Sequence, residues 1–147
     1  MRAQHELTRR FSAEFSMRAF LIHRQERTLA RLLDWTRDAD PHVRRLCSEG
    51  SRPRLPWAQR IPAFIKDPTL TAPILERLKD DPDLYVRRSV ANHLGDVAKD
   101  HPEFAFELCE RWLKDASPER HWLIRHALRH PAKKGVAKAS RLRKRAR

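Results

Sequence analysis

The sequence feature that most constrains the fold is a segment that occurs twice, 43 residues apart. Asp38-Ala-Asp-Pro-His-Val-Arg-Arg45 aligns with Asp81-Pro-Asp-Leu-Tyr-Val-Arg-Arg88, and a looser third copy runs from Ser117 to Arg125. Repeats of about this length, in which an acid–proline turn precedes an amphipathic helix, are typical of solenoids built from stacked helical hairpins. The spacing therefore predicts a short helical solenoid.

Apolar residues recur at helical spacing along most of the chain. In residues 84–98, the clearest apolar stripe consists of Val86, Val90, Leu94 and Val97. Helices are also predicted over about 4–23, 29–36, 42–49, 70–79, 102–113 and 118–129. The first of these is predicted as one helix because Leu7, Phe11, Phe15 and Ile22 fall near helical spacing. Prolines between residues 52 and 62 interrupt the helical pattern, since each removes a backbone donor. No alternating strand pattern is present, so the chain is predicted to be all-α.

The charge favours a polyanionic partner. The net charge is +13, which points first to nucleic acid and second to an anionic membrane surface. Residues 132–147 hold eight lysines and arginines and no acid, and residues 136–147 are expected to form a basic, disordered tail. The three glycines stand far apart, which excludes a glycine-rich phosphate loop.

The cellular location can be predicted from the cysteines and from the lack of a long apolar run. Cys47 and Cys109 lie in amphipathic patterns without metal-site or redox spacing, as expected for a reduced cytosolic protein. No signal peptide or membrane span is recognisable. We therefore expect a cytoplasmic protein, associated with the nucleoid if the source is bacterial.

Superposing the repeats aligns polar residues in rows. Arg45 matches Arg88 and Arg125, and Glu49 matches Asn92 and Arg129. In the central helix, Arg88, Asn92 and Asp96 are spaced four apart and share one face. Stacked hairpins would place these rows on one surface, often the concave one, with Glu49 and Asp96 among the arginines.

Two interpretations of these carboxylates remain open. The commoner one is that they orient the arginines through ion pairs such as Arg45–Glu49, and base rates alone favour it. The other is that they face a developing cation. In an N-alkylated purine nucleoside the base is already cationic and the glycosidic bond is weak, so an enzyme needs mainly to stabilise the sugar cation and position water.

Several strings in the sequence resemble the AlkC branch of the AlkC/AlkD DNA alkylation repair family. The strings are Glu14-Phe-Ser-Met-Arg-Ala-Phe20, Ser48-Glu-Gly-Ser-Arg-Pro-Arg-Leu-Pro-Trp57, Tyr85-Val-Arg-Arg-Ser-Val-Ala-Asn-His-Leu94, Lys99-Asp-His-Pro102, Glu110-Arg-Trp-Leu113 and His121-Trp-Leu-Ile-Arg-His-Ala-Leu128. The resemblance covers about residues 4–135. It implies a right-handed solenoid of HEAT-like repeats with a basic concave face that holds duplex DNA.

The resemblance also implies an activity and a set of site residues. The activity is that of a DNA N-glycosylase that removes cationic alkylpurines such as 3-methyladenine from duplex DNA, without conventional base flipping. Glu14, Glu49 and Asp96 would be the carboxylates at the scissile nucleoside, and Trp57 would contact the lesion sugar. The residues implied to bind the DNA backbone are Arg45, Arg54, Arg88, Asn92, Arg125 and Arg129. No metal or organic cofactor is implied, and the protein is expected to act as a monomer.

Each candidate residue also has a simpler explanation. Glu14 could pair with Arg18, and Trp57 could anchor its loop on Leu55 and Ile61. His126 and His130 have metal-like spacing, but no third ligand is evident.

The functional alternatives are a non-catalytic DNA-binding solenoid and a HEAT-type protein-interaction scaffold. The family usually has more helical sequence at both ends, so a shortened solenoid, with residues 1–135 as its repeat domain, is expected.

Overall fold

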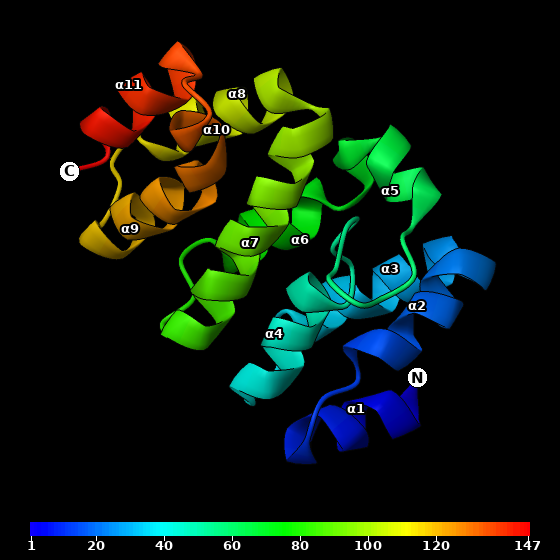
Figure 1. Ribbon diagram of the computed structural model, residues 1–147. Helices are drawn as coiled ribbons and strands as arrows, with labels where there is room; N and C mark the ends of the chain where they lie inside the picture. Colours follow the sequence, from blue (N-terminus) through cyan, green and yellow to red (C-terminus); the bar gives the residue numbers. More distant parts are fainter.

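The computed structural model describes all 147 residues and consists of eleven α-helices and one short 3₁₀ helix, without strands (Figure 1). In chain order the elements are α1 (Arg2–Arg10), α2 (Glu14–His23), α3 (Gln25–Trp35), α4 (Pro41–Glu49), α5 (Pro62–Lys66), η1 (Pro68–Leu70), α6 (Ala72–Leu78), α7 (Leu84–Asp100), α8 (Pro102–Trp112), α9 (Pro118–Ala127), α10 (Arg129–Lys133) and α11 (Ala137–Arg145). The prediction of an all-α fold is confirmed.

The helices stack as successive repeats. The three helices that carry the repeated sequence, α4, α7 and α9, lie in a row, with α7 packed between the other two. Helices α3, α6 and α8 pack against this row as the second members of the hairpins. The predicted helical solenoid is therefore confirmed, and equivalent repeat positions fall on neighbouring helices. No helix combines the length and the apolar character that a membrane span requires.

The acid–proline turns begin the repeat helices in the same way. Asp40 caps α4 by accepting a hydrogen bond from the His42 amide at 2.8 Å, and Asp83 caps α7 through the Tyr85 amide at the same distance. An aspartate at the N-cap satisfies an amide that the helix itself leaves without a partner. The repeated turn is therefore a helix-start signal read directly from the sequence.

Neighbouring repeats are joined by arginine–aspartate pairs. Arg44 of α4 donates to both carboxylate oxygens of Asp81 in the next turn, at 2.6 and 3.0 Å. Arg120 of α9 makes the same bidentate contact with Asp80, at 2.6 Å to each oxygen. Bidentate contacts of this kind fix orientation as well as distance, so they set the register of one repeat on the next.

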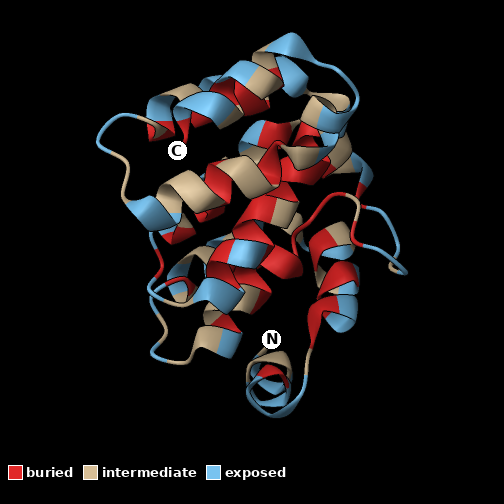
Figure 2. Cartoon of the chain, turned by 60° about the vertical axis from the view of Figure 1, so that its left-hand side comes forward, coloured by how far each residue is buried: buried red, intermediate tan, exposed pale blue.

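The core lies between the two rows of helices. The predicted stripe of α7, Val86, Val90, Leu94 and Val97, is fully buried. In Figure 2 the buried positions occupy the sides of the helices that face one another, and the exposed ones lie on the outer turns. Cys47 and Cys109 are both buried in this core, as free thiols.

The prediction of one helix over residues 4–23 was wrong. Residues 4–23 form two helices, because the chain turns at Phe11, which has φ −149° and ψ −109° and closes α1 through the Leu7 carbonyl. Ala13, Met17 and Leu21 are buried, whereas Leu7, Phe11 and Phe15 are exposed, Phe11 to 80%. Because the chain turns between the two helices, one helical periodicity does not identify the buried face of both.

The predicted disordered tail is also corrected. Residues 137–145 form helix α11, which packs against α8, α9 and α10. Its buried face consists of Ala139, Leu142 and Ala146. Apolar residues three and four positions apart are enough to dock a helix even when most of its other side chains are basic. The helical region therefore extends beyond residue 135.

Candidate functional site

Three carboxylates from separate helices meet in one network of ion pairs. Glu14 begins α2, Glu49 ends α4, and Asp96 lies in the second half of α7. Arg45 donates to Glu14 at 3.2 Å and lies 3.5 Å from Glu49. Arg52 then joins Glu49 to Asp96, so two arginines link the three predicted carboxylates in one network.

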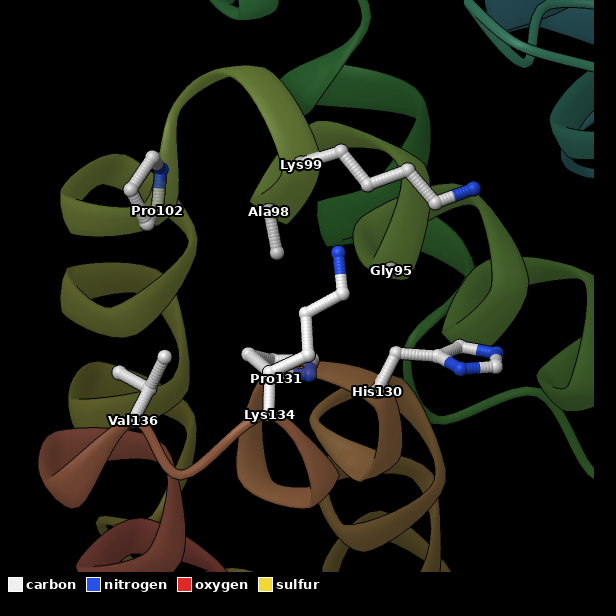
Figure 3. A pocket seen from close by; sticks show the side chains of 8 residues that line it. All are labelled: Gly95, Ala98, Lys99, Pro102, His130, Pro131, Lys134 and Val136. Atoms are coloured by element: carbon white, nitrogen blue, oxygen red, sulfur yellow. The ribbon is translucent and has the colours of Figure 1, made fainter.

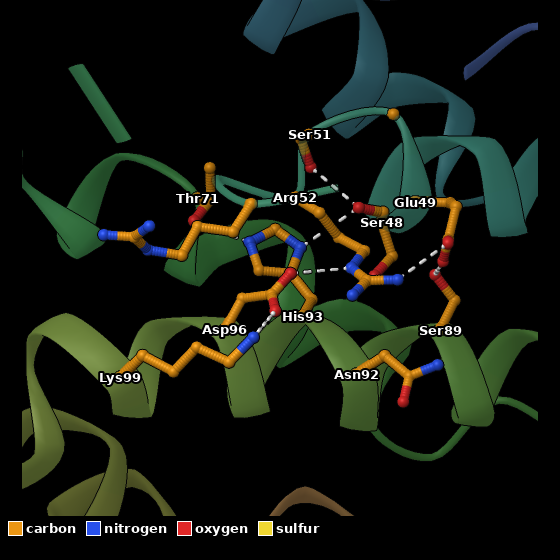
Figure 4. A network of polar contacts seen from close by, with 12 residues as sticks. Ser48, Glu49, Ser51, Arg52, Thr71, Ser89, Asn92, His93, Asp96 and Lys99 are labelled. Atoms are coloured by element: carbon orange, nitrogen blue, oxygen red, sulfur yellow. Dashed lines mark hydrogen bonds and ion pairs between the residues drawn. The ribbon is translucent and has the colours of Figure 1, made fainter. Parts of the chain in front are cut away.

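Arg52 is the central residue of this network (Figure 4). Its guanidinium lies 2.9 Å from Glu49 Oε1 and donates from Nε to Asp96 Oδ2 at 2.8 Å. Burial by itself would lower the pKa of Arg52, but the hydrogen bond and charge of Asp96, together with Glu49, outweigh burial and raise it. Arg52 was not among the predicted site residues, although its spacing of three from Glu49 in the sequence was a signal that could have found it.

Glu49 is held from both sides. Ser89 Oγ donates to its Oε2 at 2.5 Å, while Arg52 and Arg45 contact Oε1. The simpler interpretation of Glu49, an ion pair with Arg45 one turn away, is therefore present in the structure. It does not exclude a role in chemistry, because a carboxylate can accept about four hydrogen bonds and three donors leave room for another.

Glu14 does not pair with Arg18, contrary to the simpler explanation. Arg18 donates instead to the carbonyls of Gly50, Arg52 and Gln59, at 3.3, 2.6 and 2.7 Å. Burial, and then the charge of Arg52, lower the pKa of Arg18 to about 10. Arg18 thus ties the irregular loop after α4 to α2. Glu14 keeps one oxygen, Oε2, buried and without a hydrogen-bond partner.

Asp96 opens into a polar cleft of about 280 Å³. The cations around the cleft are Arg52, Lys99 and Arg129, and its floor includes Asn92 and Gly95. Lys99 Nζ donates to Asp96 Oδ1 at 3.0 Å, and Arg129 donates to Asn92 Oδ1 at 2.9 Å. The cleft therefore combines one carboxylate with three positive charges, which suits a phosphate bound beside a developing cation.

A less polar cavity adjoins the cleft. It has a volume of about 340 Å³ and shares Gly95, Lys99 and His130 with the cleft of Asp96. Figure 3 shows the Lys134 side chain directed into it, and its lining also includes the apolar residues Pro102 and Val136. Burial, and then the charges of Arg129 and Lys99, lower the pKa of His130, which indicates a positive potential across this region.

Trp57 does not anchor its loop. Its side chain is 98% exposed, and its φ of 64° places a large aromatic residue in the left-handed region. Such a conformation costs a non-glycine residue roughly 1–2 kcal/mol. The adjoining Pro56 lines the cleft of Asp96, so Trp57 is next in sequence to a residue of the cleft. An exposed, strained tryptophan beside a charged cleft is available for contact with a ligand.

The predicted DNA-binding arginines differ in whether they are paired with a carboxylate. Arg88 is exposed and makes no side-chain hydrogen bond or ion pair. Arg54 is paired with both oxygens of Asp100 at 2.7 Å. Arg45 is shared between Glu14 and Glu49 and lies 4.9 Å from the ring centroid of Tyr85. Arg45 and Arg54 are thus held by carboxylates, whereas Arg88 is free to meet an anion.

The remaining predicted positions are Asn92 of α7, Arg125 of α9 and Arg129 of α10. Asn92 Oδ1 accepts hydrogen bonds from Arg129 and from His126 Nε2, the latter at 3.2 Å. Arg125 donates to the backbone carbonyl of Ala146. Burial, and then the charges of Arg129 and Arg88, lower the pKa of His126 to about 4, so His126 is a neutral donor at neutral pH. No group of three His, Cys, Asp or Glu side chains is arranged to hold a metal ion.

Comparisons with known proteins agree with the helical fold. No protein-family model matches the chain. A curated relative from Bacillus subtilis (strain 168), the uncharacterized protein YhaZ, is 45% identical over 139 residues, which is 95% of this chain and 39% of the relative. The solved structure of Pseudomonas fluorescens alkylpurine DNA glycosylase AlkC, bound to DNA containing an abasic site analog, superposes with a TM-score of 0.92 and 51% identity. That match covers 96% of this chain and 39% of the other. The chain spans about two fifths of the length of each of these proteins.

Proposed function

Because the chain belongs to the AlkC-type family of HEAT-like repeat proteins, we propose that it is a DNA N-glycosylase that removes cationic alkylpurines, such as 3-methyladenine, from duplex DNA. The observation that carries the proposal is the linkage of Glu14 and Glu49, through Arg45 and Arg52, to Asp96, which lines a basic cleft. Carboxylates on a surface that binds phosphates are unfavourable unless they perform a task there.

The task is stabilisation of a sugar cation. When the bond between C1′ and the purine nitrogen breaks, its electron pair leaves with the base, which departs neutral because it carried a positive charge. The sugar becomes oxocarbenium-like, and water adds to C1′ while a carboxylate accepts its proton. No acid is required to protonate the leaving group, so anionic carboxylates can both stabilise the sugar cation and accept the proton of the attacking water.

The residues divide this work according to their surroundings. Asp96 lines the cleft and is oriented by Arg52 and Lys99. Glu49 is fixed by Ser89 and Arg52, which keeps its charge in one position during the reaction. Glu14 is linked to Glu49 through Arg45 and adds a negative charge to the network, with its Oε2 buried and without a hydrogen-bond partner. Trp57 would lie against the lesion sugar, where a π face attracts positive charge.

The decisive test is base release from methylated duplex DNA. Wild-type protein should release 3-methyladenine, detected by chromatography, and Glu49→Gln should reduce the rate on the order of a hundredfold or more. Glu107→Gln makes the same chemical change at an exposed position of α8 and should retain the wild-type rate. Full activity in Glu49→Gln, with its fold intact by circular dichroism, would exclude the assigned role.

A second function is favoured by one observation. Every carboxylate of the network already has a basic partner, as expected if the acids only orient the arginines of a non-catalytic DNA-binding solenoid. That function predicts salt-dependent binding to duplex DNA without base release. A protein-interaction scaffold predicts neither.

A repair enzyme of this kind acts where chromosomal DNA lies. We therefore expect the protein in the cytoplasm, at the nucleoid if the source is bacterial. Fractionation of cells that produce a tagged protein, with and without nuclease treatment, tests this location.

A further inference from the structure

Three adjoining hollows extend from Asp96 across the third repeat to α11. Arg129 lines both the cleft of Asp96 and a second hollow of about 240 Å³. Arg125 and Arg143 line this second hollow and also a third, of about 450 Å³. We refer to the third hollow, between α9, α10 and α11, as the α11 groove; its charged residues are Arg125, Lys133, Arg143, Lys144 and Arg147.

The positive charges in the α11 groove have no carboxylate partners there. No acidic residue lines the second hollow or the α11 groove. Arg125 and Arg143 are fixed by backbone carbonyls instead, since Arg125 donates to Ala146 O and Arg143 Nε donates to Arg125 O at 3.1 Å. A carbonyl orients a guanidinium without neutralising it. The groove therefore holds neighbouring like charges, a repulsion that a bound anion would relieve.

Helix α11 directs only part of its charge into the groove. Ser140, Arg143, Lys144 and Arg147 line it, with the spacing of one helical face. Arg141 and Arg145 are exposed on the same helix but do not line the groove. Arg143 and Lys144 therefore line the groove while Arg141 and Arg145, of the same charge, do not, as expected if an anion binds in the groove.

The second hollow also presents two aromatic rings. Trp122 and His126 stack with their ring centroids 4.9 Å apart and an interplanar angle of 19°. Both line the second hollow together with Arg125, Arg129 and Arg143. The combination of cations with a flat aromatic surface suits a nucleic-acid strand, which offers phosphates together with sugars and bases. A single small anion would use only one of these hollows.

We propose that one strand of the duplex follows this path away from the lesion, and that Arg143 and Lys144 bind its phosphates in the α11 groove. The inference rests on the proposed function, because the path begins at the cleft of Asp96. Guanidinium groups bind phosphate oxygens in a bidentate manner, and lysine adds a point charge. Helix α11 is thus a part of the DNA interface that positions the duplex without touching the scissile bond.

The test compares two variants of the whole chain with equal loss of charge. Arg143→Gln/Lys144→Gln removes groove residues, and Arg141→Gln/Arg145→Gln removes the same charge from the exposed side of α11. Binding of undamaged duplex DNA is measured by fluorescence anisotropy at several salt concentrations. The groove variant should lose affinity on the order of tenfold at about 0.1 M salt, and the slope of log K against log salt should fall by about one to two. The control variant should lose much less.

Because Arg143 also contacts a backbone carbonyl, the single variants Lys144→Gln and Arg145→Gln provide a comparison in which neither side chain supports the fold. Equal losses in the two members of each pair would overturn the inference, since long-range charge alone would then explain binding. Base release by the same proteins separates the two proposals. If the wild type releases base but the groove and control variants lose equal affinity, only the proposal for the α11 groove is overturned. If the groove variants lose more affinity than the controls but no protein releases base, only the proposed glycosylase activity is overturned. A chain without affinity for duplex DNA overturns both.

Discussion

Arg52 donates from Nε to Asp96 Oδ2 at 2.8 Å, although the two residues are 44 positions apart. The same guanidinium contacts Glu49 at 2.9 Å, so one cation fixes the distance between two carboxylates from neighbouring repeats. The arrangement requires a charged residue in the interior, which is stable only because its partners are charged as well.

Removal of Arg52 should therefore be costly. Arg52→Met leaves Glu49 and Asp96 with fewer donors in a buried site, and the free energy of unfolding should fall by about 3 kcal/mol. Arg54→Met breaks the pair with Asp100, which is more exposed, and should cost no more than about 1 kcal/mol. Urea unfolding of both variants checks the difference. Similar losses would mean that Arg52 is a surface ion-pair residue in solution.

Replacement of Trp57 should separate stability from activity. Trp57→Gly relieves the positive φ, so its free energy of unfolding should stay within about 1 kcal/mol of wild type and be no lower than that of Trp57→Ala. Base release should fall on the order of tenfold in both variants, because the π face is lost. Chemical unfolding and a single-turnover assay measure the two quantities. A strongly destabilised Trp57→Gly would show that the indole packs in solution.

Stability should decline in mild acid through His93. This side chain is fully buried between Ser48 O and Thr71 Oγ1, and burial lowers its pKa to about 4. The unfolded chain then binds a proton between pH 6.5 and 4 that the folded chain does not. His93 therefore stabilises the fold fully above pH 6.5, and up to about 3 kcal/mol is lost as the pH falls to 4.

Urea unfolding at pH 7 and pH 4.5 measures this loss. In His93→Gln the difference between the two pH values should shrink, while His126, whose pKa is lowered in the same direction, still contributes. A pH dependence that is unchanged in His93→Gln would assign the effect to other groups.

The two thiols should be inert in the native protein. Burial raises the pKa of the Cys109 thiol to about 12 and raises that of Cys47 as well. Since the thiolate is the reactive species, iodoacetamide should modify neither cysteine at pH 8, and both after denaturation. Mass spectrometry counts the adducts. Rapid native modification would indicate that the core opens locally.

Helix α11 should contribute to folding. Leu142 is buried, and Leu142→Ala should lower the free energy of unfolding by about 2 kcal/mol or more. Arg141→Ala changes the neighbouring exposed residue and should be close to neutral. A disordered tail would make both substitutions neutral in chemical unfolding.

The repeated turns were predictable from the sequence because their information is local. Asp40 and Asp83 bond amides two residues away, so the helix starts follow from short strings. The stripe from Val86 to Val97 was predictable for the same reason. Arg52 between Glu49 and Asp96, by contrast, depends on the packing of one repeat on another, which residue spacing does not specify. Helix α11 was not predicted because its sequence is mostly basic and only Ala139, Leu142 and Ala146 are buried, so its composition is typical of a disordered tail.

The bidentate pairs Arg44–Asp81 and Arg120–Asp80 have a consequence for how the chain unfolds. The stability of a repeat array depends on the coupling between adjacent units as well as on each unit alone. Strong coupling penalises every boundary between a folded and an unfolded repeat. The protein should accordingly lose its structure in one cooperative transition rather than fray from its ends, and the ion-pair network at the carboxylates should persist until that transition.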